Sequence, residues 1–233
     1  SIRRQRQMCI RDSFNIYGKA NYEFVKGLSA FLDLQYRHVN VKMQDPSDWF
    51  IGNSFTGDYI INEKYDFFNP KFGFNYDINA NNKVYISYAI AHKEPVRNNY
   101  EAWNAGSEKP KAERLNDLEL GYKYQSSKFS AGANFYYMNY KNQFVLTGEL
   151  NSIGEAVTRN LEKTYRMGVE LEAAWKPVSW FQWDANATWS KNRAKDMMVT
   201  LEDGETKASL GETPLSFSPD FIFNNILTFQ YAG

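Results

Sequence analysis

Glu170 and Glu172 have the residue type and spacing that come closest to a reactive pair. Two carboxyl groups can share general acid and base work when they flank a substrate. Two residues apart on an extended strand, however, they point to the same face of a sheet, as do the other polar residues at that spacing. We therefore interpret the pair as part of a polar lining and expect no enzymatic activity.

Histidine and cysteine offer little other chemistry. His38 and His92 are the two histidines and Cys9 is the single cysteine, so the sequence contains too few such ligands for a typical metal cluster and cannot form an internal disulfide. Neither histidine has an evident nucleophile beside it in the sequence. We expect no metal site and no cofactor. The 27 basic and 27 acidic residues cancel, which argues against a nucleic-acid partner.

The composition limits how this chain can meet a membrane. Its mean hydropathy is −0.60 and 43% of its residues are hydrophobic. No stretch approaches the roughly 18 consecutive apolar residues of a membrane helix, so a membrane-spanning role requires strands. Aromatic residues make up 17% of the chain, a composition suited to boundaries between water and an apolar phase.

Alternation of apolar and polar residues with period two predicts nine strands. Their expected ranges are 13–25, 28–42, 65–78, 83–93, 114–125, 129–144, 158–175, 180–192 and 216–231. One face of each strand is apolar and carries no charge, as in the row Leu28, Ala30, Leu32, Leu34, Tyr36. Such a face is what lipid requires of a transmembrane strand.

The opposite face is polar and is predicted to be wet. If the strands close into a barrel, this face lines the lumen, where it would contact water or a plug. The residues that we assign to this lumen-facing or plug-contacting role are Lys71, Asn75, Glu119, Lys123, Glu170, Glu172 and Asp184.

The connections alternate between tight and long. Tight ones are expected at 26–27, 79–82, 125–128 and 176–179, and long ones at 43–64, 94–113, 145–157 and 193–215. Short periplasmic turns and long extracellular loops are typical of an outer-membrane barrel. Aromatic residues near both strand ends fit two interfacial girdles. The predicted class is therefore an all-β, transmembrane, antiparallel up-and-down β-barrel, of which this chain supplies about nine strands.

Several segments resemble TonB-dependent receptors, especially those of Bacteroidetes-like bacteria. The resemblance is carried, in the order of the family, by FFNPKFGFNYDIN (67–79), KVYISYAIAHKEPVRNNY (83–100), KPKAERLNDLELGYKY (109–124), FYYMNYKNQFVLTGELNSIGEAVTRN (135–160), YRMGVELEAAWKP (165–177) and FSPDFIFNNILTFQY (217–231). It implies a 22-stranded barrel, an N-terminal plug, energy transfer from TonB, and location in the outer membrane of a Gram-negative bacterium. Plug, TonB box and closing strand have no counterpart here, so we expect a partial barrel over 13–233.

The resemblance implies uptake of a ferric siderophore or similar metal chelate, with cobalamin or a glycan as other cargoes. Aromatic and basic residues of the long loops are the candidate substrate-binding residues: Arg97, Tyr100, Trp103 and Arg159. The expected partners are outer-membrane lipid, the TonB complex through an N-terminal region, and a small nutrient ligand.

Two alternatives remain open at this level. One is a passive porin or another outer-membrane barrel, which would lack a plug. The other is a soluble β-rich binding module, which would need polar residues where the aliphatic rows lie. Residues 1–12 show no period-two pattern and include four arginines. We interpret them as a non-native lead-in outside the barrel.

Overall fold

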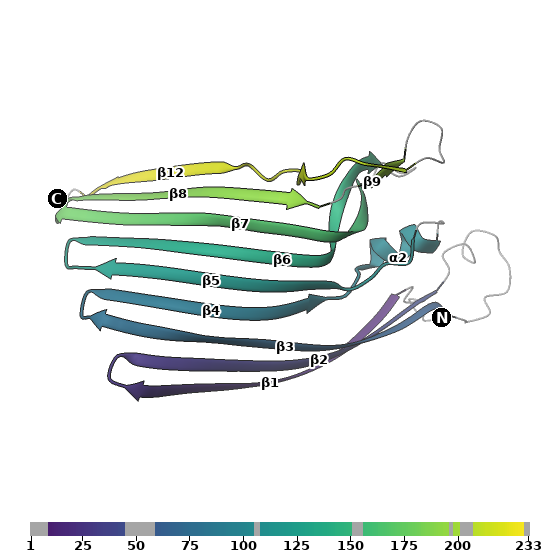
Figure 1. Cartoon of the computed structure of the whole chain (residues 1–233), viewed down its shortest axis with the longest axis horizontal. Coiled ribbons are helices and arrows are strands. Elements are labelled where there is room, and N and C mark those ends of the chain that lie inside the picture. The colour runs from purple at the N-terminus through teal and green to yellow at the C-terminus, as the bar shows by residue number, and fades with distance from the viewer. Residues whose placement is uncertain are drawn as a thin grey trace, which may run out of the picture.

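The computed structural model describes residues 9–44, 59–104, 108–150, 156–195, 198–200 and 207–230. Long strands dominate the fold (Figure 1). The strands are β1 (Cys9–Val25), β2 (Leu28–Gln44), β3 (Tyr59–Asn79), β4 (Asn82–Lys93), β5 (Glu113–Gln125), β6 (Phe129–Leu150), β7 (Ala156–Val178), β8 (Phe181–Ala194), β9 (Met198–Thr200), β10 (Lys207–Ser209), β11 (Thr213–Pro214) and β12 (Phe221–Phe229). A helix, α2 (Arg97–Asn104), lies between β4 and β5.

The long strands form one antiparallel sheet in sequence order from β1 to β8, with β11 and β12 both paired to β8. Each strand pairs with the next, as an up-and-down barrel requires. In the part of the chain that the structure covers, β1 and β12 lie at the two edges and do not pair with each other. The sheet is therefore an open portion of a barrel wall.

All the tight turns lie at one end of the sheet and α2 lies at the other (Figure 1). Gly27, at φ 86°, provides the left-handed residue of the first turn, where Val25 pairs with Leu28. In the second turn, the Asn79 side-chain oxygen accepts a hydrogen bond of 2.9 Å from the backbone of Asn81. The predicted separation of short and long connections is confirmed.

The register places the apolar rows on one face, called the outer face here. Phe72 pairs with Tyr88, Tyr88 with Leu118, Leu118 with Tyr137, and Tyr137 with Met167. Most of the large apolar side chains of this face are exposed. The other face, called the inner face, carries the polar residues.

Four expectations need correction. The first strand begins at Cys9, so Cys9–Asp12, which we placed outside the barrel, pair with residues 40–43 of β2. Strands β3, β6 and β7 have 21 to 23 residues and extend further into the long connections than predicted. The 94–113 connection contains α2, and the 193–215 connection contains the β9–β10 pair and β11. The last strand spans 221–229, narrower than predicted.

Candidate functional site

We had predicted that the inner face is polar throughout. It is not. Near the long connections it carries a buried apolar cluster of Val39, Val41, Met43, Ile61, Phe67 and Tyr100, hereafter the inner cluster. A membrane-spanning strand needs only about 9–11 residues, whereas β2 has 17 and β3 has 21. The inner cluster therefore lies on strand ends beyond the tight-turn half of the sheet. Period-two reasoning missed it because the alternation inverts along β2: beyond Tyr36 the outer-face positions become polar, and the apolar residues Val39, Val41 and Met43 lie on the inner face.

Helix α2 supplies the residue at the centre of the inner cluster. The Tyr100 side chain is fully buried, and its hydroxyl lies 2.7 Å from the Tyr65 hydroxyl. On its other side the helix reaches β7, where the Asn99 side-chain nitrogen donates to the Thr158 hydroxyl at 2.8 Å. The Asn99 side-chain oxygen also accepts from the Val96 backbone at 2.8 Å, which caps the helix start. These contacts tie α2 to both β3 and β7.

Tyr100 is chemically a neutral phenol in this position. Burial, followed by the hydrogen bond with Tyr65, raises the pKa of Tyr100 well above its usual range. A phenolate would be the form able to bind a ferric ion directly. Tyr100 therefore acts here as an apolar anchor with one hydrogen bond.

An ion-pair network lies beside the inner cluster. Glu94, which is 3% exposed, accepts from Arg37 at 2.8 Å and also contacts Arg11. Its second carboxylate oxygen is buried and has no hydrogen-bond partner within the structure described. Removing one arginine of such a buried pair would leave an uncompensated charge. Sequence reasoning missed this network because Arg11 lies 83 positions from Glu94.

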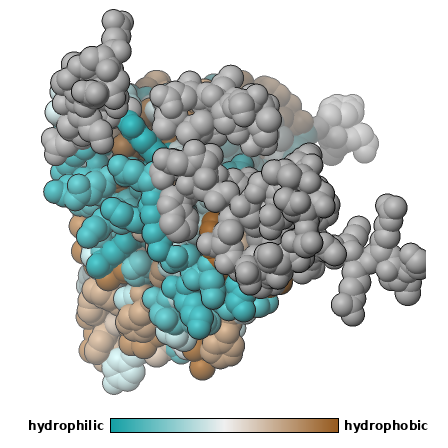
Figure 2. All heavy atoms as spheres, turned by 90° about the vertical axis from the view of Figure 1, so that its right-hand side faces the viewer, coloured by the Kyte–Doolittle hydropathy of each residue, from teal (hydrophilic) through white to brown (hydrophobic). Residues whose placement is uncertain are grey.

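The structure brings the four predicted substrate-binding residues to the long-connection end. Arg97, Tyr100 and Trp103 follow one another at three-residue intervals along α2, which places their Cα atoms on neighbouring parts of one helix face. Arg159 lies on β7, next to the residue that Asn99 contacts. Arg97 and Arg159 are exposed, and the Trp103 side chain lies outside the described part. Figure 2, which faces this end of the molecule, shows hydrophilic residues gathered here in the part that is not drawn in grey.

The predicted lumen-facing residues share the inner face, because each is directly next to an apolar outer-face residue of its own strand, and adjacent strand residues point to opposite faces. Lys71 and Asn75 lie on β3, Glu119 and Lys123 on β5, Glu170 and Glu172 on β7, and Asp184 on β8. Glu170 and Glu172 lie opposite Asn134 and Gly132 of β6. Their placement fits the polar lining that we inferred, while contact with a plug stays a prediction.

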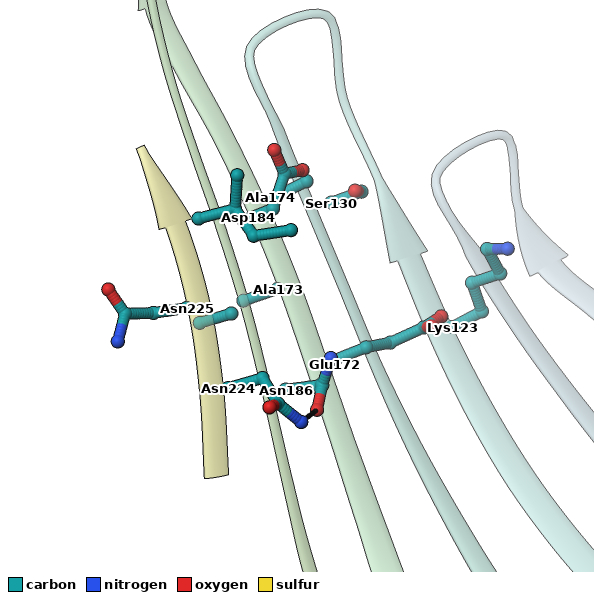
Figure 3. A pocket seen from close by; sticks show the side chains of 11 residues that line it. Lys123, Ser130, Glu172, Ala173, Ala174, Asp184, Asn186, Asn224 and Asn225 are labelled. Carbon is teal, nitrogen blue, oxygen red and sulfur yellow. Dashed lines mark hydrogen bonds between the residues drawn. The ribbon is translucent and has the colours of Figure 1, made fainter. Parts of the chain in front are cut away.

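A shallow hollow of about 270 Å³ lies on β7, β8 and β12 near the tight turns. Its residues belong to both faces of the sheet: the Glu172 side chain extends toward the Lys123 strand, while Asn225 points away from the sheet on the far side of β12 (Figure 3). Asn224 donates to the Asn186 side chain across the inner face at 3.0 Å. Ligand pockets are enclosed, concave and largely apolar, so this hollow is a surface feature of the wall.

Within the described residues there is no group of three or more His, Cys, Asp or Glu side chains placed to hold a metal ion. His38 instead contacts Asp66 at 2.7 Å, and the His92 ring stacks on Phe67. None of the described helices has the length and apolar character needed to cross a membrane.

Comparisons with known proteins agree with this architecture. Residues 9–233 match the family described as TonB dependent receptor-like, beta-barrel. No curated protein matches the sequence.

Several solved structures share the fold. The ferric yersiniabactin uptake receptor FyuA from Yersinia pestis has a TM-score of 0.65 and 17% identity over 94% of this chain and 31% of its own. The ferripyoverdine receptor of Pseudomonas aeruginosa has a TM-score of 0.65 and 16% identity over 97% and 27%. The FrpB iron transporter from Neisseria meningitidis has a TM-score of 0.58 and 19% identity over 83% and 27%.

The chain thus spans between a quarter and a third of these structures. Its antiparallel strands correspond to part of a barrel wall, and the family match extends over nearly the whole sequence. The chain belongs to the TonB-dependent receptor β-barrel family and is part of a protein of the Gram-negative outer membrane.

Proposed function

We propose that this chain is the barrel segment of a receptor that imports a ferric siderophore or a similar metal chelate by TonB-dependent transport. Family membership over residues 9–233 is the observation that carries the proposal. The proteins of similar structure include an iron transporter, a copper transporter and two receptors for ferric chelates, which supports this class of cargo. In this proposal the complete receptor has a plug, a TonB box and further strands that close a 22-stranded barrel, and its outer face contacts lipid.

We place the cargo contacts at the long-connection end of the sheet. Arg97 and Arg159 are exposed there and present guanidinium groups, which bind carboxylate or other anionic groups in a bidentate manner. Trp103 shares the helix with Arg97 and is the third candidate contact. Tyr100 takes a positioning role, since it is fully buried and holds α2 against β3.

The inner face below this site is wet and carries both signs of charge. Lys71, Lys123, Glu119, Glu170 and Glu172 lie along it. A mixture of both signs suits contact with a folded plug better than it suits a strongly selective ion channel, which is lined by charges of one sign. We propose that these residues meet the plug. TonB would act through that plug region, and the receptor would bind no nucleic acid.

Uptake by the complete receptor tests the cargo. A strain that lacks the receptor gene should fail to grow on the matching ferric chelate as its sole iron source, and the gene should restore growth. Cobalamin and oligosaccharides form the comparison arms of the panel. Restored growth only with one of those arms would show that the ferric-chelate assignment is wrong. Uptake that persists without TonB would point to the passive porin instead.

Binding by purified complete receptor tests the site. Arg97→Ala and Arg159→Ala should each weaken chelate binding by about tenfold or more, because a hydrogen bond to a charged group contributes roughly 1.5–3 kcal/mol. Lys26→Ala in the first tight turn is the matched control and should bind normally. Tyr100→Ala should weaken binding through displacement of α2, whereas Tyr100→Phe should retain most of it. Unchanged affinity in both arginine variants would remove this site from the proposal.

A further inference from the structure

Four basic side chains form a row across the outer face near the long connections. Arg114 on β5 pairs with Lys141 on β6, and Lys141 pairs with Lys163 on β7. Lys195, directly after β8, donates its backbone N–H to the Lys163 carbonyl at 2.9 Å, which places it opposite Lys163. These four residues are hereafter the basic row. We propose that the basic row binds the phosphate groups of lipid head groups in the outer leaflet.

The basic row belongs to the outer face by its register. Leu118, Tyr137 and Met167 lie in register with one another on this face, and Arg114, Lys141 and Lys163 lie four residues from them in turn. An even separation keeps side chains on the same side of a strand. Beyond the basic row the pattern changes: Asn142 has φ 56° and Gln143 is buried. The basic row is thus the last regular level of the outer face.

Among the residues that the structure describes, no carboxylate forms an ion pair with the basic row. All four side chains are exposed. Neighbouring cations on the same face do have carboxylate partners: Lys191 pairs with Glu212 at 3.1 Å, and Arg193 pairs with Asp220 at 3.1 Å. Arg114 donates a hydrogen bond to the Asn116 side-chain oxygen at 3.3 Å, which is a neutral partner.

Four cations directly opposite one another are unfavourable without an anion. Side chains in paired positions are about 4.5–5.5 Å apart at Cβ, and like charges placed there destabilise a sheet. The same spacing allows one phosphate group to contact two adjacent cations through its several oxygens. A phosphate group between neighbouring members of the basic row would convert this repulsion into attraction.

The position along the strands favours a lipid over a free ion. The Lys195 ammonium lies 5.1 Å from the centre of the Tyr165 ring, and Tyr165 stacks on Tyr137 at 6.3 Å. Aromatic rings at this depth are typical of the membrane interface. Lys163 lies two residues further out along β7 than Tyr165. Two residues span about 7 Å along a strand, or about 5 Å in height for a strand tilted near 40°. The apolar side chains below, such as Phe135, Val169 and Trp189, would contact the acyl chains.

The proposal rests on the outer-membrane placement and does not depend on the cargo. The test uses the complete receptor in detergent, with bis-phosphorylated lipid A as the probe and native mass spectrometry as the readout. The variant Lys141→Gln/Lys163→Gln/Lys195→Gln should bind lipid A about 100-fold more weakly, since each basic residue near an anionic surface contributes about a factor of five. A lipid A preparation stripped of phosphate should bind the unchanged receptor equally weakly.

A matched triple variant controls for the loss of three charges. Lys26→Gln/Lys128→Gln/Lys176→Gln removes three exposed lysines from the tight turns at the opposite end of the sheet, and it should bind lipid A normally. The arginine version, Lys141→Arg/Lys163→Arg/Lys195→Arg, should also bind. The Lys141→Gln/Lys163→Gln/Lys195→Gln variant is hereafter the glutamine row variant. Equal lipid A binding by this variant and the unchanged receptor would overturn the proposal. Equal loss in both glutamine triples would overturn it as well.

Thermal stability provides a second readout that also detects a folding defect. Without lipid A, the glutamine row variant should unfold at the same temperature as the unchanged receptor or higher, because like-charge repulsion is relieved. Added lipid A should stabilise the unchanged receptor and not the variant. Millimolar inorganic phosphate alone should stabilise neither. Stabilisation by inorganic phosphate equal to that by lipid A would show a free-anion site and would contradict a lipid site.

Discussion

The Tyr85 side chain lies across Gly121 of the neighbouring strand on the inner face. A Cβ atom at Gly121 would overlap the Tyr85 ring, and the Tyr85 hydroxyl passes over this glycine to donate to the Asn134 side chain at 2.9 Å. One side chain thus joins β4, β5 and β6. Glycine is needed at position 121 because the Tyr85 ring lies close against the backbone there, and not because of a left-handed φ.

Gly121→Ala should therefore destabilise the barrel by about 1–3 kcal/mol, because overpacking forces a ring off its rotamer and the Asn134 contact is lost. Gly18→Ala is the control, since a Cβ atom there would meet nothing within 4 Å. Urea unfolding of the complete receptor, followed by heat-modifiable gel mobility, measures the difference. Equal midpoints for the two variants would rule out this packing.

Adjacent residues on β7 test the assignment of the two faces. Leu171 lies between Ala133 and Ala187 on the outer face, whereas Glu170 lies between Asn134 and Thr188 on the inner face. Leu171→Arg should impair assembly in the membrane by about 2–4 kcal/mol, while Glu170→Arg should have a mild effect. The amount of heat-modifiable folded barrel is the measurement. Similar damage from both variants would contradict the proposal that the outer face contacts lipid.

Cysteine labelling on intact cells tests which end is extracellular. Ser209 on β10 lies at the long-connection end and Ser127 in the turn before β6. With the native Cys9 replaced by Ser, Ser209→Cys should react with an impermeant maleimide and Ser127→Cys should not. Ser107→Cys should also react, although Ser107 lies outside the described residues. Labelling of Ser127→Cys alone would reverse the topology.

Glu212 gives a pH-dependent contact between the β10–β11 connection and the wall. The Tyr165 hydroxyl donates to Glu212 at 2.7 Å and Lys191 lies 3.1 Å away, and these contacts lower the pKa of Glu212. A carboxyl group with a depressed folded-state pKa stabilises above its unfolded value, near 4.3, and loses that contribution as the pH falls through the folded value. Packing of this connection should hold from pH 7 to 5 and loosen below about pH 4.

Hydrogen exchange of residues 208–216, corrected for intrinsic rates, measures that loosening. Glu212→Gln should show raised exchange already at neutral pH and little further change in acid, because its side chain cannot titrate. Protection that persists unchanged to pH 3 in the unmodified receptor would show that Glu212 does not hold this connection.

The barrel class and its two faces could be predicted from the sequence because alternation is a local property. Successive strand residues point to opposite faces whatever they pair with, so the rows of Phe72, Leu120 and Leu171 mark an outer face before any partner is known. Tight turns also fix the register of the two strands that they join. Lys26 and Gly27 determine that Val25 pairs with Leu28 in this way.

Contacts across the long connections could not be predicted, because their length leaves register and path undetermined. The sequence contains Lys141 and Lys163, but only the paired β6 and β7 place them opposite each other. Likewise, Tyr100 was recognised as a loop aromatic, and only the fold buries it against Tyr65. These relationships depend on packing between distant segments, which a period-two pattern does not encode.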